Sequence, residues 1–299
     1  MALETSPAAT QAAEWVEPPR RSLIRRLVRY RSLMFGGGIF ALLVLAAAFA
    51  PLLTRYGPDT IDALATLSGP SAAHWFGTDQ FGRDLFARVL YGSRLTIAAS
   101  FVAVLIAVVL GSLVGIVAGM AGGYVDLVLM RVVDLILIFP GILPALAITA
   151  ILGPSLTNVV IAIGLSSIPV YARVVQATTL QVKTLNYVES ARASGASPLR
   201  IVMRHVLPSV ASQIIVAAST GLGVSVLYVA ALGFLGLGVQ PPTPELGTML
   251  SDGRDYVLLA WWISFFPGAV ITLYVVAVNL MGDGLRDLFD PHALQRLGG

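Results

Sequence analysis

The chain has 299 residues, of which 57% are hydrophobic and only 12% are charged, and its mean hydropathy is +0.83. A soluble globular chain carries about 25% charged residues, so this composition excludes an ordinary soluble domain. The absence of cysteine excludes disulfides, thiol catalysis and thiolate metal sites. The net charge is +3, and the arginines flank apolar runs, which indicates membrane topology rather than a nucleic-acid surface.

The apolar runs predict membrane-spanning helices, because several of them reach the roughly 20 residues that a helix needs to cross a bilayer. They are continuous rather than alternating, which favours helices over the strands of a barrel. The first run, 33–53, follows a polar arm, 1–32, that is too long for the n-region of a signal peptide, so we expect a retained span. Arginines precede this run and predict a cytoplasmic N-terminus. They are Arg20, Arg21, Arg25, Arg26, Arg29 and Arg31.

The rest of the chain divides into an outer segment and five further spans. Residues 54–93 are polar and are expected outside, residues 94–285 form the main membrane core, and residues 286–299 form a cytoplasmic tail. The spans predicted after the first are 95–118, 127–152, 159–175, 206–235 and 259–281. Of the 19 lysines and arginines, about two thirds fall in the predicted cytoplasmic segments. The sequence therefore predicts an all-helical polytopic membrane protein with six spans and both termini cytoplasmic.

Glycines and prolines predict how two of these helices pack and bend. Gly111, Gly115 and Gly119 recur every four residues, so they share one helix face and allow another helix to approach closely. Pro140 and Pro144 each remove a backbone donor from the span 127–152 and predict that this helix is kinked.

Two pairs of side chains stand out in or beside the spans. Arg131 and Asp134 lie one turn apart, and an intramembrane charge is a candidate functional residue. The alternative, which we favour at this point, is an ion pair between them near the inner interface. Trp261 and Trp262 begin the sixth span and fit the aromatic belt at the outer interface.

A charged loop at about 184–205 separates the fourth and fifth spans and is predicted to fold as two short helices. Leu185, Val188 and Ala191 form an apolar stripe on the first helix. Gly195 ends this helix, and Ser197-Pro198 reads as an N-cap followed by proline in the first turn of the second helix. One interpretation is an amphipathic linker on the membrane surface. The other is a slim surface of small residues that docks in the groove of another protein.

The same loop carries a pattern that is similar to the permease subunits of ATP-binding-cassette importers. The pattern here is Glu189-Ser190-Ala191, then Gly195, then His205-Val206-Leu207-Pro208. Further segments resemble the dipeptide, oligopeptide and nickel permeases of the C type: 74–94, 131–140, 234–250 and 279–291. In that family the loop is the coupling helix that docks on the ATPase. The resemblance implies docking residues Glu189, Ser190, Ala191, Gly195, Leu207 and Pro208.

The resemblance also implies a fold, partners and a location. The fold would be that of type I (MetI-like) importer permeases, in a bacterial cytoplasmic membrane. The partners would be a second homologous permease in a heterodimer, two ATP-binding cassette subunits and an extracytoplasmic substrate-binding protein. Di- or oligopeptides are the expected substrates, with nickel, glutathione or another small solute as alternatives. ATP and Mg would be used by the partner subunits, and this chain would bind no cofactor or metal.

One consequence can be checked in the sequence. A P-loop needs GxxxxGK followed by Ser or Thr. The single lysine, Lys183, follows Val182 and not glycine, so this chain carries no P-loop and its energy must come from another subunit.

A polar cluster in the outer segment allows two interpretations. His74, Asp79, Arg83 and Asp84 lie close together in the sequence. They would contact the binding protein or gate the pore mouth, or they would satisfy one another as a hydrogen-bonded outer loop.

Two other classes of protein remain as alternatives. An ion-coupled secondary transporter usually needs a buried carboxylate within the bilayer, for which Asp134 is the candidate. A membrane-embedded enzyme would need converging catalytic groups. The three histidines, His74, His205 and His292, fall in an outer segment, the charged loop and the tail, so they are not expected to share a metal.

Overall fold

The computed structural model describes residues 31–289, and this part of the chain is helical apart from its connecting loops and one isolated β-bridge. The main helices are Arg31–Ala48 (α2), Ala50–Leu53 (α3), Leu85–Ala121 (α4), Gly123–Leu137 (α5), Ile142–Leu152 (α6), Leu156–Lys183 (α7), Asn186–Ala193 (α8), Pro198–Ile201 (α9), Leu207–Phe234 (α10), Leu246–Gly253 (α11) and Trp262–Phe289 (α12). Five of them are long and apolar enough to cross a membrane, and six spans result if α5 and α6 count as one broken span.

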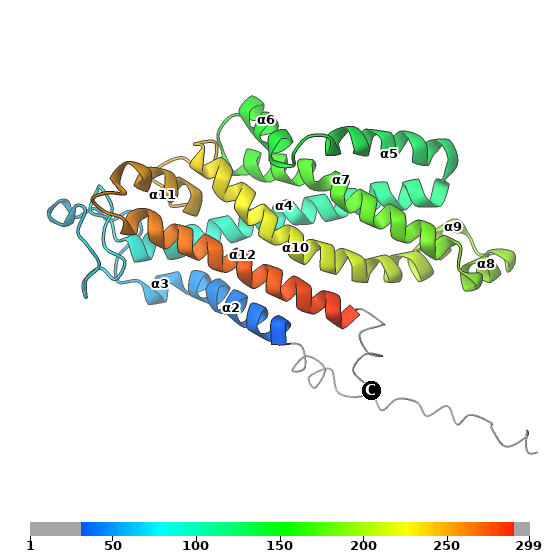
Figure 1. Cartoon of the computed structure of the whole chain (residues 1–299), viewed down its shortest axis with the longest axis horizontal. Coiled ribbons are helices and arrows are strands. Elements are labelled where there is room, and N and C mark those ends of the chain that lie inside the picture. The colour runs from blue at the N-terminus through cyan, green and yellow to red at the C-terminus, as the bar shows by residue number, and fades with distance from the viewer. Residues whose placement is uncertain (1–30, 290–299) are drawn as a thin grey trace, which may run out of the picture.

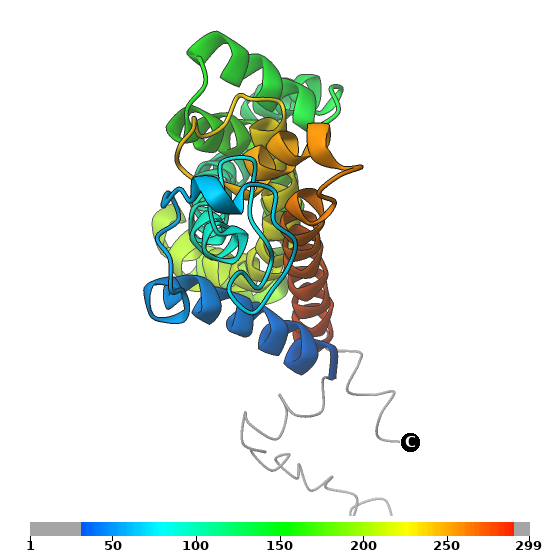
Figure 2. The same cartoon turned by 90° about the vertical axis from the view of Figure 1, so that its left-hand side faces the viewer.

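The long helices form a bundle whose short elements collect at its two ends (Figure 1). The loop between α3 and α4 lies with α11 at one end, which the predicted topology places outside and which we call the outer end. The helices α8 and α9 lie at the opposite, inner end. Figure 2 looks onto the outer end and shows the loop from α3 spread across the start of α4. The bundle therefore separates the charged loop from the outer segment by the full length of the spans.

Helices α4, α7 and α12 are longer than the apolar runs that predicted them, whereas α2 and α10 are slightly shorter. Helix α4 begins at Leu85, ten residues before the predicted span, because the Asp84 side chain caps it by accepting from the Ala87 amide at 2.8 Å. Helices α7 and α12 likewise run to Lys183 and Phe289, beyond their predicted inner ends. Hydropathy marks the part of a helix that lies in hydrocarbon, whereas caps decide where the helix itself begins and ends.

The predicted span 127–152 is not one kinked helix but two helices at 85° to each other. The break lies between Leu137 and Ile142 and contains Pro140, which supports the role predicted for that proline. Pro144 does not add a kink, since it falls in the first turn of α6, where its missing donor has no helical partner to lose. The Tyr228 hydroxyl from α10 lies so close to the break that a side chain at Gly141 would collide with it.

The predicted glycine face is confirmed as the contact between α4 and α7. A Cβ atom added to Gly115 would lie 2.6 Å from the Ala172 carbonyl oxygen. At Gly111 it would lie 2.7 Å from Cβ of Tyr171, and at Gly119 it would meet Thr179. Because a real Cβ does not fit at these separations, the two backbones approach only as closely as glycine allows.

The two tryptophans at the start of α12 differ in environment. Trp261 is half exposed, as expected of a residue in an aromatic belt. Trp262 is buried, and its indole nitrogen donates to the Thr78 carbonyl oxygen at 3.1 Å. The belt prediction is therefore wrong for Trp262, which fastens the outer loop to α12 instead.

Candidate functional site

The charged loop folds as predicted, with a glycine between two short helices. Helix α8 ends in a Schellman motif, in which the Gly195 amide donates to the Arg192 carbonyl and the Ala196 amide donates to the Ala191 carbonyl, each at 3.0 Å. Gly195 has φ +81°, a conformation that residues with a side chain rarely adopt. The turn therefore requires glycine at this position.

The second helix starts as the sequence indicates and leads directly into α10. The Ser197 side chain accepts from the Arg200 amide, and Pro198 is the first residue of α9. A π-helical turn, Val202–Val206, joins α9 to α10, and Pro208 lies in the first turn of α10. Because proline cannot donate to the preceding turn, the widened π-helical geometry falls where the regular bonding pattern is interrupted.

One side of the loop is anchored in the protein. Val188 and Val206 are completely buried and Ile201 almost so. They form one cluster with Val182 at the inner end of α7 and Val210 of α10. The loop is therefore packed firmly against both spans that it connects. The predicted apolar stripe is correct at Val188 but wrong at Leu185, whose side chain is 43% exposed.

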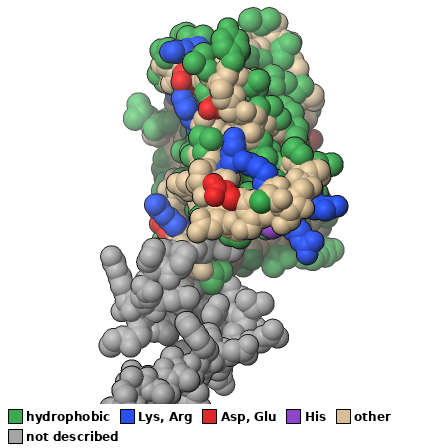
Figure 3. All heavy atoms as spheres, turned by 90° about the vertical axis from the view of Figure 1, so that its right-hand side faces the viewer, with side chains coloured by type: hydrophobic (Ala, Val, Ile, Leu, Met, Phe, Trp, Pro, Cys, Tyr) green, Lys and Arg blue, Asp and Glu red, His purple; other side chains and the backbone are tan. Residues whose placement is uncertain are grey.

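The opposite side of the loop is open and carries most of the docking residues implied by the resemblance. Glu189, Ser190, Gly195 and Pro208 are exposed, while Ala191 is half-buried. Leu207 is 37% exposed and belongs, with Pro208, to α10 rather than to the loop. Three exposed arginines belong to the same loop, and Figure 3, which looks onto the inner end, shows basic side chains spread over this face. The three arginines of the loop are Arg192, Arg200 and Arg204.

The predicted pair within the membrane is corrected by the structure. Asp134 forms its ion pair with Arg173 of α7, not with Arg131. A second polar contact joins the same two helices, since the Gln176 side chain donates to Asp126 at 2.7 Å. Sequence spacing favoured the neighbour three residues away, but the two charges of the observed pair are 39 residues apart and meet only because α5 lies along α7.

The four polar residues of the outer segment form two separate pairs. His74 Nδ1 lies 2.9 Å from Asp84 Oδ2. Arg83 donates through Nε to Asp79 Oδ2 at 2.6 Å. Asp79, Arg83 and Asp84 are buried, so the arrangement matches the hydrogen-bonded loop among the two interpretations. Contact of these residues with a binding protein, or a gating role, stays a prediction.

Arg88 is a buried residue at the outer end that sequence reasoning did not select. Its side chain is 4% exposed. It donates to the carbonyls of Pro58 at 3.0 Å and Pro242 at 3.3 Å, and it lies within ion-pair distance of Asp59 and Asp79. Two of these partners are 30 and 154 residues away, so no local pattern in the sequence identifies Arg88 as the residue that joins the loop before α4 to the loop before α11.

Glu245 is the second residue that was missed. It is 1% exposed and caps α11, because its Oε2 accepts from the Thr248 amide at 2.9 Å. Its Oε1 accepts from the Thr96 hydroxyl of α4 at 2.9 Å. Burial raises the pKa of the Glu245 carboxyl above its ordinary value, and hydrogen bonds from the Gly247 and Thr248 amides and from the Thr96 hydroxyl oppose this effect. The residue fastens the outer helix to the bundle.

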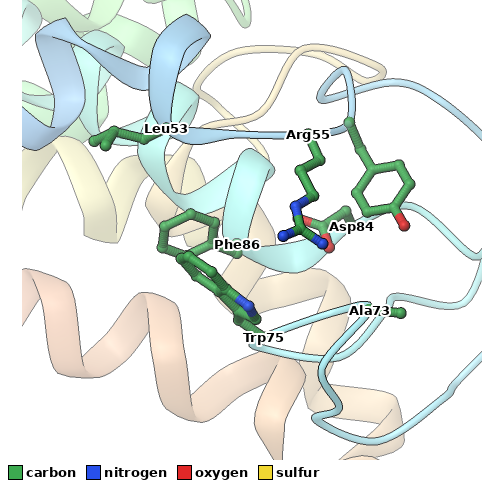
Figure 4. A pocket seen from close by; sticks show the side chains of 7 residues that line it. Leu53, Arg55, Ala73, Trp75, Asp84 and Phe86 are labelled. Carbon is green, nitrogen blue, oxygen red and sulfur yellow. The ribbon is translucent and has the colours of Figure 1, made fainter.

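An open pocket at the outer end combines charged and aromatic walls. Figure 4 shows Arg55 and Asp84 in one part of it and Trp75 and Phe86 in another. The other residues that line it are Leu53, Tyr56 and Ala73.

The geometry is thus a membrane bundle with a rigid, basic helix–glycine–helix loop at one end and a packed outer cap at the other. Residues 111–295 match the family of binding-protein-dependent transport system inner membrane components. The chain belongs to this family. Residues 19–70 also match the N-terminal transmembrane domain of oligopeptide transport permease C, so the chain is a C-type permease of the peptide importer group in the bacterial inner membrane.

Curated relatives cover almost the whole permease. It is 44% identical to the dipeptide transport system permease protein DppC of Alkalihalophilus pseudofirmus, over 91% of this chain and 90% of the relative. It is also 44% identical to the glutathione transport system permease protein GsiD of Pectobacterium atrosepticum, over 92% of each. A probable D,D-dipeptide transport system permease protein, DdpC of Escherichia coli, is 46% identical over 85% of this chain and 86% of the relative.

Solved structures share the fold at lower identity. An inward-facing form of the MetNI methionine ABC transporter aligns with a TM-score of 0.56 and 22% identity, and the match covers 68% of this chain and 96% of the other. An amino acid ABC transporter crystallised with histidines aligns with a TM-score of 0.52 and 17% identity, over 67% of this chain and 93% of the other. The predicted MetI-like permease fold is confirmed.

Proposed function

We propose that this permease forms one half of a heterodimeric pore that imports short peptides with energy from two separate ATP-binding subunits. A second homologous permease forms the other half, and an extracytoplasmic binding protein delivers the substrate. The observation that carries this proposal is the loop α8–Gly195–α9, which is exposed on one side and packed against α7 and α10 on the other.

The loop has the properties of a mechanical contact. Its buried valines join it to two spans, so a force on α8 is passed to α7 and α10 rather than absorbed by a flexible linker. Its exposed side carries Glu189 and small residues between exposed arginines, which suits a shallow groove with acidic residues on its rim. In this arrangement the inner end faces the cytoplasm and both termini lie on that side.

The energy source follows from what this chain does not contain. Its sequence has no P-loop, because Val182 precedes the single lysine. ATP and Mg are therefore assigned to the partner subunits, and the permease itself binds neither a cofactor nor a metal. Movement of the ATP-binding subunits against α8 would open the pore alternately to the two sides of the membrane.

The substrate class rests on the relatives. The three described above are named for the transport of dipeptides, D,D-dipeptides and glutathione, which all contain short peptide-like chains with free carboxylates. Di- or oligopeptides are the substrates that we propose, and glutathione, nickel or another small solute remains the alternative within the family.

Affinity purification of the tagged chain from native membranes in mild detergent, with mass spectrometry of the retained proteins, tests the assembly. We expect a second permease and P-loop ATPases. Recovery of the intact chain alone, or as a homo-oligomer, would overturn the proposal. Peptide uptake in cells should then fall on ATP depletion, whereas loss on addition of an uncoupler with ATP maintained would indicate an ion-coupled secondary transporter.

A further inference from the structure

Three charged side chains gather on the exposed face that α5 and α7 share. Arg173 and Asp134 form an ion pair, and their side chains are 41% and 43% exposed. Arg131 is exposed three residues before Asp134 on α5, and within residues 31–289 it forms no ion pair. The cluster therefore carries one net positive charge, and Arg131 holds donors that no acidic group occupies.

The cluster lies within the predicted spans, towards their inner ends. Arg173 is ten residues before the inner end of α7, roughly 15 Å along the axis, and falls just inside the predicted end of its span at residue 175. Arg131 is eight residues from the start of α5, roughly 12 Å along that helix. A long side chain near a helix end can reach the interface, but the pair between Arg173 and Asp134 holds both of these groups at their depth.

A lipid-facing position does not suit this cluster. Charges within the bilayer are costly against hydrocarbon and are found facing the interior of a bundle or a water-filled cavity. The exposed face of α4 between residues 101 and 117 offers the contrast, because it is apolar, with Leu105, Val109 and Leu113 about half exposed. The face of α4 suits lipid or an apolar partner, whereas the charged face of α5 and α7 suits water.

We propose that Arg131, held beside the Asp134–Arg173 pair, binds the carboxylate of a peptide as it passes through the pore. The planar guanidinium of arginine forms two parallel hydrogen bonds with a carboxylate, and this pairing is strengthened where water is partly excluded. Asp134 is already paired, so it fixes Arg173 next to the site without neutralising Arg131. The identification of the ligand as a peptide rests on the proposed function. The presence of an aqueous, anion-selective face does not depend on it.

The absence of cysteine makes a thiol reporter possible in the otherwise unchanged chain. Leu135 lies one turn from Arg131 on the same face and is 54% exposed, so Leu135→Cys reports on the site. Leu105→Cys on α4, at 50% exposure, is the matched control. The complex, co-expressed with its partner subunits in inverted vesicles, is treated with an anionic or a cationic methanethiosulfonate reagent of similar size.

We expect Leu135→Cys to react about tenfold faster than Leu105→Cys and to prefer the anionic reagent. Adding Arg131→Gln should abolish this preference, whereas adding Arg94→Gln, an exposed arginine of α4, should not. Equal, slow labelling of the two reporters would overturn the proposal, because the charged face would then not be wet. A preference that survives Arg131→Gln would also overturn the role of Arg131.

The ligand class is tested on the same reporter with alanyl-alanine and with its C-terminal amide. We expect the free dipeptide to slow labelling of Leu135→Cys and the amide to leave it unchanged. Equal effects of the two peptides, or none, would overturn the assignment to a carboxylate. Failure of the proposed function is recognised separately, because the unmodified complex would then accumulate no peptide whatever the reporters show.

Discussion

The Glu245 carboxylate accepts a hydrogen bond from the Thr96 hydroxyl at 2.9 Å, and this contact joins the outer helix α11 to the spanning helix α4. The two residues are 149 positions apart in the chain. Glycines make the junction possible, since a Cβ at Gly233 would lie 2.2 Å from Glu245 Oε2 and one at Gly92 would press on the Glu245 backbone. Glu245 thus fastens the outer helix α11 to the start of α4.

The first prediction concerns the charge of Glu245. Its pKa is raised by burial, so the unfolded chain loses this proton at a lower pH than the folded chain does. The contribution of this carboxyl to stability is therefore greatest below its unfolded pKa of about 4.3 and decreases as pH rises towards its folded pKa. Glu245→Gln has no ionisable group, so its stability does not decrease with rising pH in this way, and its side-chain oxygen can still accept from the Thr248 amide. We expect the melting temperature of the purified complex to rise at pH 8 relative to wild type and to differ little at pH 4.5.

Two variants complete this test. Glu245→Ala removes the cap and the bond to Thr96, so it should lower stability by about 1–2 kcal/mol at both pH values. Glu189→Gln changes the same functional group on the exposed face of α8 and should leave the melting temperature unchanged. A Glu245→Gln curve parallel to that of wild type across this pH range would contradict a role for the buried charge.

The difference between what the sequence predicts and what the structure adds follows from how local each signal is. The seam at Gly115 and the end of α8 at Gly195 are predictable, because a four-residue repeat and a helix-stopping glycine act within one or two turns. Asp134 was assigned the wrong partner because the true one, Arg173, is on another helix. Glu245 resembles any polar loop residue in the sequence, and its burial depends on three elements that meet only in the fold.

The second prediction concerns the glycine seam between α4 and α7. Gly115→Ala places a methyl group 2.6 Å from the Ala172 carbonyl oxygen and 2.8 Å from Cβ of Val175. The helices must separate, which should destabilise the complex by about 1–3 kcal/mol. Gly37→Ala on α2 is the control, because no atom lies within 4 Å of the added group and alanine favours a helix. Thermal unfolding in detergent should show shifts of opposite sign, and a seam variant as stable as wild type would contradict the tight packing.

The third prediction concerns Arg88 at the outer end. Arg88→Leu leaves the carbonyls of Pro58 and Pro242 without this donor and removes one of the two arginines that face the buried Asp79. Breaking a buried charge network of this kind should lower stability by about 3 kcal/mol. The control, Arg94→Leu, alters an exposed arginine that lies over the ring of Tyr91. This substitution should lower stability by less than about 0.5 kcal/mol. Similar losses for the two variants would mean that Arg88 does not organise the outer loops.

The last prediction separates docking from backbone strain at the charged loop. Gly195 and Gly236 have nearly the same conformation, with φ +81° and +77°, and neither would bring an added Cβ within 4 Å of another group. Arginine at either position costs about 1–2 kcal/mol of backbone strain, but only Gly195 lies on the proposed docking surface. Gly195→Arg should therefore insert into the membrane normally, retain no ATPase subunits on purification and lose peptide uptake. Gly236→Arg, at the outer end, should retain the ATPases. The backbone strain is matched in the two variants. If both variants lost the ATPase subunits, the cause would be misfolding rather than a lost docking contact. If Gly195→Arg retained the ATPase subunits and showed normal uptake, α8 would not be part of the docking surface.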